Sequence, residues 1–486
     1  MQSKQMFLKI CRNLRPIFNE IEKCGGASYM VGGSVRDLVL NKPIKDADIE
    51  VHGITQKKLE SALKKFGSVI LVGKKFGVLR LKKFDVDWSL PRKDSKGRKP
   101  IVEIDPFMSI EVACKRRDLT MNAMAIDLNF VCKNMGNIRA LKGQSFVDAL
   151  QIIDPYEGLK DIEKMRLRAV DKTLFIEDPL RFFRVMQCIG RFNMQPDANL
   201  NKICKTMQLW DAELGQPLAR ERIFEEIKKL FLKSKQPSLG IRWLLKINRL
   251  KEVLPEIYDL IGTKQNPKYH PEGDVFEHTM QVLDAAANIE FYDEKNIENE
   301  KFLVMMASLC HDLGKPKATD AELHARGHER MGVPICNSLL KRLTNQKTFI
   351  AAIKKLVEYH RAPAALLNDG AELKAYKRLA LKLAPEATLR HVGLLTLADM
   401  RGRKGKSACP FKKKFAGFFL RFMNKIKSAQ VEHKPEPAIL QGRHLIDCVK
   451  PGPEMGKFLN LAYNIQIEEG IKDWQELKRR VLSTKF

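Results

Sequence analysis

The stretch Ser28-Tyr29-Met30-Val31-Gly32-Gly33-Ser34-Val35-Arg36-Asp37 decides the fold of the N-terminal part of this 486-residue chain. Its first residues are typical of a strand, the two glycines predict a tight turn, and a helix-like run follows. Glycines in such a turn let backbone N–H groups approach a phosphate, and the N-terminus of the next helix favours an anion. Arg36 can add a charge-assisted contact. Taken alone, however, a Gly-Gly turn is more often an ordinary turn.

A pair of carboxylates follows in Asp46-Ala47-Asp48. Residues two apart on a strand point to the same face, so these two like charges need a cation between them. Mg²⁺ fits because it binds carboxylate oxygens and substrate phosphates together, and two such ions can activate a hydroxyl and stabilise a departing pyrophosphate. The alternative is a solvated, Asp-rich turn. Asp85 and Asp87 share one face of a later strand, and either is a candidate third carboxylate.

Hydrophobic periodicity divides the chain into two kinds of structure. Apolar residues at helical spacing predict an amphipathic helix over residues 1–23, ended by the glycines that follow. Strand-like patterns then appear at Ser28–Val31, Ala47–Val51, Phe76–Leu81, Phe84–Leu90 and Met124–Leu128. From about residue 155 the patterns are helical almost to the end. The predicted fold class is therefore an α/β segment followed by an all-α remainder.

The composition is that of a folded protein with a large excess of positive charge. Apolar residues make up 44% of the chain and charged residues 30%, so it can bury cores. The net charge of +28 favours a polyanionic partner, for which RNA or DNA fits better than a small acid. A generally basic proteome is the alternative explanation.

Cysteine usage and hydropathy indicate the compartment. The 10 cysteines form no C-x-x-C pair, which argues against a zinc ribbon or a disulfide framework and for reduced thiols. The N-terminus has basic residues but no long apolar core after them, unlike a secretory signal. Because the longest apolar stretches are too short to span a bilayer, we expect a soluble cytoplasmic protein with no membrane partner.

The stretch Arg116-Arg117-Asp118-Leu119-Thr120-Met121-Asn122-Ala123 is a third motif of the α/β segment. Together with the glycine turn and Asp46-Ala47-Asp48, it resembles the polymerase-β superfamily branch that holds class II CCA-adding tRNA nucleotidyltransferases and bacterial poly(A) polymerases. The resemblance implies a small mixed sheet in the head and catalysis by Asp46 and Asp48, which would hold Mg²⁺. The residues implied to bind the nucleotide's triphosphate and ribose are Gly32, Gly33, Arg36, Arg117, Asp118 and Asn122.

The stretch Glu177-Asp178-Pro179-Leu180-Arg181-Phe182-Phe183-Arg184 opens a helix, with Asp178 as N-cap and Pro179 at the first helical position. Capping does not explain Arg181 and Arg184. The stretch resembles the family's nucleotide-selecting motif, which implies that Asp178 and Arg181 read the base, with Arg184 also at the nucleotide. A carboxylate accepts from the amino group of cytosine or adenine, and a guanidinium donates to the ring nitrogen. Uracil and guanine show the opposite order, so such a pair would accept CTP and ATP and reject UTP and GTP.

Two further stretches bear on how complete the activity is. The segment Pro91–Pro106 is polar and predicts a loop, and it resembles in position the flexible loop that CCA-adding enzymes need when they switch from C to A. An enzyme that adds only C would result if this loop does not function. Gln187-Cys188 stands where family members often have Arg-Phe, a departure that concerns helix packing or an RNA contact more than chemistry.

A second constellation lies in the helical part, at His278, His311-Asp312 and Asp399. Imidazole and carboxylate together suit a divalent metal of unspecified identity. The run Leu309-Cys310-His311-Asp312-Leu313-Gly314-Lys315 resembles the core of HD phosphohydrolases, which implies hydrolysis of phosphate monoesters or 2′,3′-cyclic phosphates at RNA ends. Further histidines of such enzymes correspond in position to His324, His328 and His360. The alternative is a domain kept as an RNA-binding scaffold.

The resemblance covers nearly the whole chain. It implies an N-terminal helix (1–23), a nucleotidyltransferase head (24–140), a helical neck and body that select the nucleotide and bind RNA (141–265), an HD domain (266–402) and a tRNA-binding tail (403–486). The expected reaction adds C and A to the tRNA 3′ end from CTP and ATP without a nucleic-acid template. The nearest alternative is a poly(A) polymerase or a partial enzyme, although the HD domain favours CCA addition. A different alternative is an HD phosphohydrolase with a non-catalytic RNA-binding head, and the oligomeric state stays open.

Overall fold

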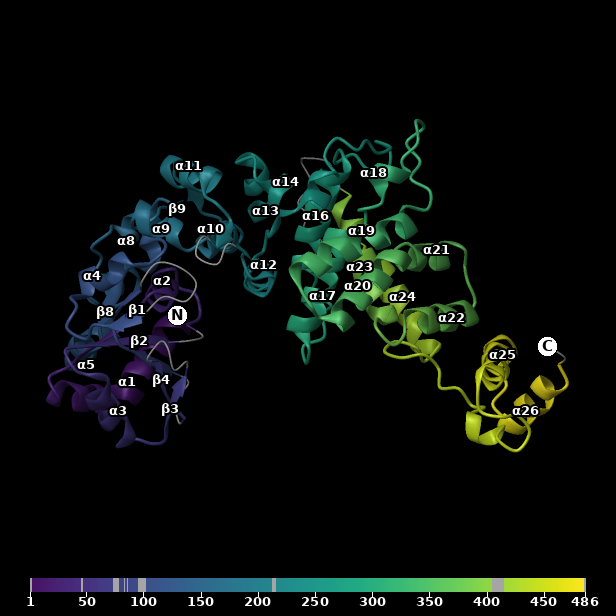
Figure 1. The fold of residues 1–486 in the computed structure, drawn as a ribbon, viewed down its shortest axis with the longest axis horizontal. Coiled ribbons are helices and arrows are strands. Elements are labelled where there is room, and N and C mark those ends of the chain that lie inside the picture. The colour runs from purple at the N-terminus through teal and green to yellow at the C-terminus, as the bar shows by residue number, and fades with distance from the viewer. Residues whose placement is uncertain are drawn as a thin grey trace. The chain divides into compact units, whose positions relative to one another are not determined.

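The computed structural model describes residues 2–44, 47–72, 78–82, 84, 86–94, 102–211, 216–403 and 415–484. The chain divides into two compact units, Met1–Glu226 and Ile227–Phe486. The first unit holds the main sheet, whereas the described part of the second unit consists of helices without a strand (Figure 1). The predicted fold class, an α/β head followed by a helical remainder, is therefore confirmed.

The head is built on a six-stranded mixed sheet in the order β3-β4-β5-β2-β1-β8. Its strands are β1 (Ala27–Val31), β2 (Ala47–His52), β3 (Val69–Val72), β4 (Val78–Leu81), β5 (Val86–Ser89) and β8 (Ala125–Asp127). Strands β2 and β5 run parallel, and the other neighbours are antiparallel. Each predicted strand has a counterpart here, and β3 is an edge strand without a predicted one.

Helix α1 (Gln2–Lys23) confirms the predicted amphipathic helix. It packs against β1 and against the helices α3 (Gln56–Lys64) and α5 (Leu128–Lys133). Its apolar stripe, which includes Phe7, Leu14 and Phe18, is buried, and the Phe18 ring lies 5.9 Å from the Trp88 ring of β5. Burial of this stripe is what anchors the helix to the sheet.

The predicted loop Pro91–Pro106 is partly a hairpin. Strands β6 (Arg92–Asp94) and β7 (Val102–Ile104) pair antiparallel, with residue 93 opposite residue 103. The prediction of a continuous loop is therefore wrong at both ends, where the β-branched residues of Val102–Ile104 favour a strand over a loop. Residues 95–101 between the strands lie outside the described residues.

Helices complete the first unit. They are α2 (Gly33–Val39), α4 (Ile110–Lys115), α6 (Met135–Ala140), α7 (Gly143–Asp148), α8 (Gly158–Glu163), α9 (Lys172–Glu177), α10 (Leu180–Phe192) and α11 (Ala198–Thr206). Helix α12 (Arg220–Lys233) begins in the first unit and ends in the second. Two short strand pairs, β9 (Arg166–Leu167) with β10 (Gln195–Pro196) and β11 (Trp210–Asp211) with β12 (Gln216–Pro217), interrupt them. The prediction of helices alone beyond residue 155 is wrong at these pairs. Each of these strands has two residues, which is too few to show the alternation of apolar and polar residues that marks a strand.

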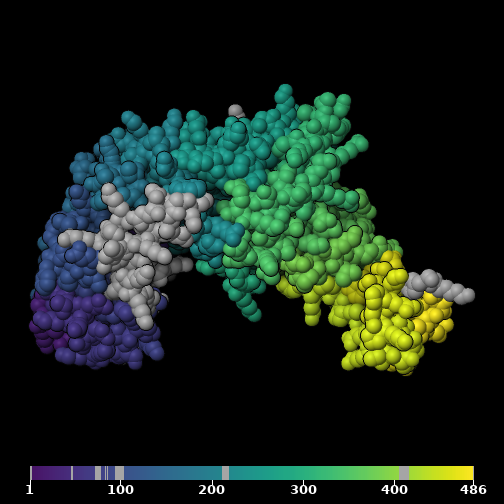
Figure 2. All heavy atoms as spheres, in the orientation of Figure 1, coloured from purple at the N-terminus to yellow at the C-terminus, as the bar shows by residue number. Residues whose placement is uncertain are grey.

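The second unit is a set of packed helices. Its longer members are α13 (Ser238–Lys246), α16 (Val275–Ala287), α17 (Ile297–Cys310), α19 (His328–Leu343), α20 (Lys347–Tyr359), α22 (Leu373–Leu383), α23 (Leu389–Gly402), α24 (Ala416–Ser428), α25 (Pro453–Glu469) and α26 (Trp474–Leu482). Shorter ones are α14 (Leu250–Val253), α15 (Pro255–Tyr258), α18 (Lys315–Ala318) and α21 (Ala362–Asn368). Helix α16 packs against both α17 and α23. Helices α25 and α26, yellow in Figures 1 and 2, pack around an apolar cluster of their own that includes Leu477 and Val481. None of the described helices has the length and apolar character needed to cross a membrane.

Candidate active sites in the two units

Asp48 lies near the start of β2, beside the glycine turn that begins α2. Its backbone N–H donates to the Ser34 hydroxyl at 3.3 Å, and its side chain is exposed. The fold therefore brings one carboxylate of the predicted pair next to the predicted phosphate-binding turn. Asp46, the other carboxylate of the pair, lies outside the described residues, as does Asp85.

Asp87 on β5 is level with Asp48, because the two residues are register partners in neighbouring parallel strands. Neighbouring strands lie about 4.8 Å apart, so the two carboxylates border one place on the sheet. Arg80 Nε donates to Asp87 Oδ1 at 2.6 Å. Of the two candidates for a third carboxylate, Asp87 is thus the one that the structure shows beside Asp48. Carboxylate oxygens in this arrangement are the donors that Mg²⁺ accepts.

The glycine turn lies directly against the Arg117 side chain. Gly32 has φ of 69°, and a Cβ atom there would lie 2.9 Å from Arg117 Nη1. The positive φ favours glycine here, and a side chain at this position would displace the Arg117 guanidinium. Arg36, one helical turn further, donates from Nη1 to Asn122 Oδ1 at 2.6 Å and from Nε to Asp37 Oδ1 at 2.9 Å.

A path of hydrogen bonds continues from Asn122 into helix α10. Asn122 Nδ2 donates to Asp118 Oδ1 at 2.9 Å, and Arg184 Nη1 donates to Asp118 Oδ2 at 3.2 Å. Burial raises the pKa of Asp118, but the charge of Arg184 and the hydrogen bond from Asn122 outweigh burial, and the pKa lies below its usual range. Arg36, Asn122, Asp118 and Arg184, predicted from separate motifs, therefore form one connected group.

Glu50 is a site residue that sequence reasoning missed. Its side chain is 1% exposed and lies 3.0 Å from Arg116 Nη2 and 3.6 Å from Arg117 Nη2. Burial opposes its ionisation, but the His52 hydrogen bond and the charges of Arg117 and Arg116 lower the pKa of Glu50 to about 2. The available signal was its spacing, because a residue two positions after Asp48 on a strand shares its face.

Glu50→Gln should lower the stability of the first unit by about 1–3 kcal/mol, because the guanidinium groups of Arg116 and Arg117 lose the carboxylate that they face. The unfolded chain binds a proton near pH 4.5 and folded Glu50 only near pH 2, so its stabilisation is present above pH 4.5 and is lost as the pH falls towards 2. Thermal unfolding at pH 7 and pH 4 measures the loss of stability and its pH dependence. Equal unfolding temperatures for the variant and wild type at both pH values would contradict this role.

The two residues predicted to read the base, Asp178 and Arg181, make different contacts at the start of α10. Asp178 Oδ1 accepts the Leu180 N–H at 3.0 Å and lies 3.9 Å from Arg222 Nη2. Helix α10 has Pro179 as its N-cap, so it begins one residue later than predicted. The Arg181 guanidinium donates at 2.7 Å to the backbone carbonyls of Leu174 and Arg116. Arg181 thus ties α10 to the Arg116-Arg117-Asp118 motif. Further along the helix, Gln187 and Cys188 are buried, so this departure from the family pattern concerns packing.

In the second unit, four buried histidines are held in one orientation. Each Nδ1–H donates to an acceptor of the protein, namely His278 to Glu272 Oε1, His311 to the Ser308 carbonyl, His328 to the Ala325 carbonyl and His360 to the Val357 carbonyl, at 2.6–2.8 Å. A neutral imidazole that donates from one nitrogen presents a lone pair on the other. All four Nε2 atoms are therefore available as acceptors or metal ligands.

These Nε2 atoms converge on the carboxylate of Asp312. His311 Nε2 lies 3.1 Å from Oδ2 and His328 Nε2 lies 3.1 Å from Oδ1. Two Nε2 pairs, His278 with His311 and His328 with His360, are each only 3.4 Å apart. Asp399 Oδ1 completes the first group at 3.1 Å from His278 Nε2. Asp312 thus joins two sets of donors that could each hold a metal ion, one with His278 and His311 and one with His328 and His360.

The electrostatics of this cluster suit a cation. Burial opposes ionisation of Asp312, yet the charges of His311 and Lys315 hold its pKa well below the usual range. Burial and the charge of His311 lower the pKa of His360 to about 3, so that imidazole is neutral at pH 7. Oδ2 of Asp312 accepts no hydrogen bond from the described residues, although the Lys315 ammonium lies 2.7 Å away. A buried carboxylate oxygen facing imidazole lone pairs is the donor chemistry of a divalent metal centre.

The sequence predicted this cluster only in part. His278, His311, Asp312 and Asp399 lie together as the HD resemblance implied, and His328 and His360 join them. His324 does not, because its side chain is 54% exposed and lies in a separate surface group with Asp320 and Glu322.

A pocket of about 440 Å³ opens onto the cluster. Asp312, His328 and His360 line it, and so do the basic side chains of Lys264, Lys315, Arg326, Arg361 and Arg403. A second pocket of about 750 Å³ shares His360, Arg361, Asp399 and Arg403 with the first. The size and the positive lining fit an anionic ligand such as a phosphate ester.

Comparisons with known proteins match both parts of the chain. The family model of the poly A polymerase head domain matches residues 28–168, and that of the HD domain matches residues 275–400. The multifunctional CCA protein of Mannheimia succiniciproducens is 34% identical over 389 residues, covering 78% of this chain and 84% of that protein. The multifunctional CCA protein of Pasteurella multocida is 32% identical over 386 residues, with 78% and 84% covered.

Solved structures show the same fold at 20% identity. The Thermotoga maritima CCA-adding enzyme complexed with tRNA matches with a TM-score of 0.54 over 98% of this chain and 95% of that chain. A CCA-adding enzyme in complex with ATP matches with a TM-score of 0.58 over the same shares.

The fold and the two sites define a nucleotidyltransferase that carries an HD domain, two kinds of domain that generally use divalent metals. The chain belongs to the family of multifunctional CCA proteins. The resemblance that the head and HD motifs predicted is thereby confirmed.

Proposed function

We propose that this chain adds C and A residues to the 3′ end of tRNA from CTP and ATP without a nucleic-acid template. The observation that carries the proposal is the path of hydrogen bonds from Arg36 through Asn122 and Asp118 to Arg184. This path joins the phosphate-binding turn to the helix that resembles the nucleotide-selecting motif. Such a reaction would place the chain in the cytoplasm, where tRNA is matured.

In the proposed mechanism Asp46 and Asp48 would be catalytic and would hold Mg²⁺, with Asp87 as a third carboxylate. Such an ion would supply acidification of the attacking hydroxyl and charge compensation for the pyrophosphate. Arg36 and Arg117, which both border the glycine turn, bind the triphosphate by charge-assisted hydrogen bonds. The buried Asp118 and the partly buried Asn122 orient Arg36 and Arg184, so that the turn and α10 would both contact one nucleotide.

We also propose that the residues at the start of α10 select the base. Asp178→Ala should lower discrimination of CTP and ATP against UTP and GTP by about 100-fold. With the carboxylate removed, binding of UTP or GTP no longer leaves an unpaired polar group in the site, so the penalty against these nucleotides is lost. Incorporation rates with each of the four nucleotides on a tRNA transcript lacking CCA measure it.

Asp197→Ala is the matched control for Asp178→Ala. Asp197 also caps a helix of the first unit, α11, where it accepts the Leu200 N–H at 2.7 Å. This control should keep full discrimination, and unchanged selectivity in Asp178→Ala would remove Asp178 from the base-reading role.

The experiment that tests the first activity uses three tRNA transcripts, ending before CCA, after C and after CC. Each is incubated with Mg²⁺ and CTP, ATP or both. Addition that stops at CCA supports the proposal, and a long A tract on any RNA indicates a poly(A) polymerase. Addition of C alone indicates a partial enzyme, and no addition leaves the head as a non-catalytic RNA-binding module.

For the second unit we propose metal-dependent hydrolysis of phosphate esters at RNA ends, including 2′,3′-cyclic phosphates. His278, His311, Asp312 and Asp399 would hold one divalent ion, and Asp312, His328 and His360 would hold a second. Such an ion would polarise the phosphate and make an attacking water more acidic. Lys315 and Arg403, which line the same pocket, would bind the phosphate oxygens.

Hydrolysis of 2′,3′-cyclic AMP and of p-nitrophenyl phosphate tests this second activity. Chelator-treated protein should be inactive and should recover when a divalent metal is restored. If the unmutated protein hydrolyses neither substrate with any divalent metal, the HD domain is a scaffold for RNA binding.

We propose further that the neck and body (141–265) and the tail (403–486) bind tRNA mainly through its phosphates. The net charge of +28 supports this, because each phosphate contact releases counterions. Affinity for tRNA should therefore fall steeply as salt is raised.

A further inference from the structure

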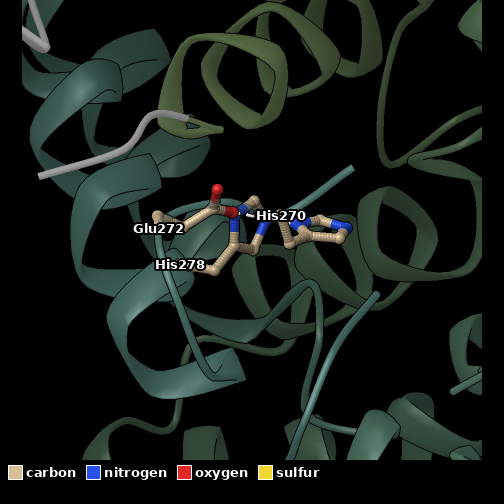
Figure 3. A group of neighbouring side chains, drawn as sticks. All are labelled: His270, Glu272 and His278. Atoms are coloured by element: carbon tan, nitrogen blue, oxygen red, sulfur yellow. Dashed lines mark hydrogen bonds and ion pairs between the residues drawn. The ribbon is translucent and has the colours of Figure 1, made fainter. Parts of the chain in front are cut away.

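Glu272, which precedes α16, is buried against two histidines that approach the same carboxylate oxygen (Figure 3). His278 Nδ1 lies 2.7 Å and His270 Nδ1 2.8 Å from Glu272 Oε1. The other oxygen, Oε2, is buried and accepts no hydrogen bond from the described residues. The charge of this carboxylate is thus directed at the two imidazole rings.

The two histidines differ in what their other nitrogen can do. His278 is fully buried, and its Nε2 lies 3.1 Å from Asp399 Oδ1 and 3.4 Å from His311 Nε2. His270 lines the 440 Å³ pocket and meets the His278 ring edge to face, with 4.7 Å between the ring centres. His270 therefore stands between Glu272 and the pocket, while His278 reaches into the cluster around Asp312.

Among the four inward-facing histidines, only His278 donates its Nδ1 hydrogen bond to a carboxylate. A carboxylate that accepts from a ligating histidine fixes the ring's tautomer and orientation and makes the opposite nitrogen a stronger donor. The other three donate to backbone carbonyls, which fix the orientation, and the Glu329 carboxylate lies 3.8 Å from His328 Nδ1, beyond hydrogen-bond distance.

We propose that Glu272 is a positioning residue for the HD metal centre. It holds His278 with the proton on Nδ1 so that Nε2 faces the ion, and His270 shields the carboxylate from the pocket. This inference rests on the proposed metal-dependent function of the second unit. The alternative use of the same three residues is a separate ion held by His270, Glu272 and His278.

The contacts favour positioning over a separate ion. Both histidines approach one oxygen at hydrogen-bond distance, which leaves the second oxygen uninvolved, whereas an ion would draw the carboxylate and both ring nitrogens around itself. The imidazole of His278 has two ring nitrogens. Its Nδ1 donates to Glu272, and its Nε2 faces Asp312 and Asp399.

The test is metal binding by the full chain, measured by calorimetry with Mn²⁺ and by visible absorption with Co²⁺. Glu272→Ala should weaken the affinity of the centre about 10–100-fold and change the Co²⁺ spectrum, because His278 can then rotate or shift its proton. Glu272→Gln should fall between Ala and wild type, since an amide oxygen accepts the hydrogen bond without the charge. Nucleotidyl transfer, which the head performs, should stay at wild-type rate and shows that the variants are folded.

The matched control is Glu277→Gln on the same segment. Glu277 pairs with Arg242 at 2.7 Å, away from the cluster, so its loss should leave metal affinity and spectrum unchanged. Wild-type affinity in Glu272→Ala would overturn the inference. Loss of one bound ion with the remaining affinity intact would instead show a separate site at His270, Glu272 and His278. An unmutated protein that binds no ion at all would overturn the proposed HD function itself.

Discussion

Asp48→Asn should abolish nucleotidyl transfer while hydrolysis by the second unit continues. The substitution keeps the size of the side chain and the backbone hydrogen bond to Ser34, but it removes the charge that faces Asp87 across the parallel strands. A ligand of a catalytic cation contributes several kcal/mol to transition-state stabilisation, so the rate of C incorporation should fall about 10³-fold or more. Single-turnover extension of a tRNA transcript lacking CCA measures this rate.

The control for Asp48→Asn is Glu60→Gln, another carboxylate of the head. Glu60 lies on the surface of α3 and pairs with Lys64 at 2.7 Å, so its charge is not directed at the site. This variant should transfer nucleotides at the wild-type rate. A decrease of less than about tenfold in Asp48→Asn would exclude Asp48 from the catalytic centre.

Asp312→Asn should have the largest effect in the second unit. Its two carboxylate oxygens serve different donor groups, Oδ2 with His311 and Oδ1 with His328. Removing the charge weakens both groups together, so phosphate-ester hydrolysis should fall about 10³-fold or more and bound metal should be lost. Hydrolysis of 2′,3′-cyclic AMP and the metal content of the purified protein are the measurements, with nucleotidyl transfer expected to be unchanged.

Two further variants separate chemistry from folding in this experiment. Asp320→Asn alters the exposed group of Asp320, Glu322 and His324, and it should change neither hydrolysis nor metal content. Because Asp312→Asn also leaves the buried Lys315 without its carboxylate, His360→Gln serves as a second test that keeps that ion pair. Full hydrolysis in both Asp312→Asn and His360→Gln would show that the cluster is not the active centre.

The sequence predicts well those features that depend on local pattern. Strand periodicity placed β1, β2 and β5. The motif residues Arg36 and Asp118 proved to be connected through Asn122, which is hydrogen-bonded to both. Capping chemistry predicted that Asp178 contacts the start of α10, where it accepts the Leu180 N–H, but the helix begins one residue later than predicted, with Pro179 as its N-cap.

The features that sequence could not supply depend on contacts between distant segments. Glu50 and Glu272 act on other side chains and were not predicted as site residues, so only the fold shows that they contact Arg117 and His278. The sequence offers His324 and His328 as candidates of the same kind. In the structure, His328 is buried in the metal cluster, whereas His324 lies at the surface. Short strand pairs such as β9 with β10 escape prediction because their pairing, not their composition, defines them.

The donors around Asp312 come from five helices or their ends, α16, α17, α19, α20 and α23. An ion held there would act as a cross-link between segments more than a hundred residues apart in the chain. A ligand that binds only the folded state stabilises it by about 2.7 kcal/mol at a concentration of 100 times its dissociation constant. Metal supply would then set how long the second unit survives heat and proteolysis, independently of any substrate that it turns over.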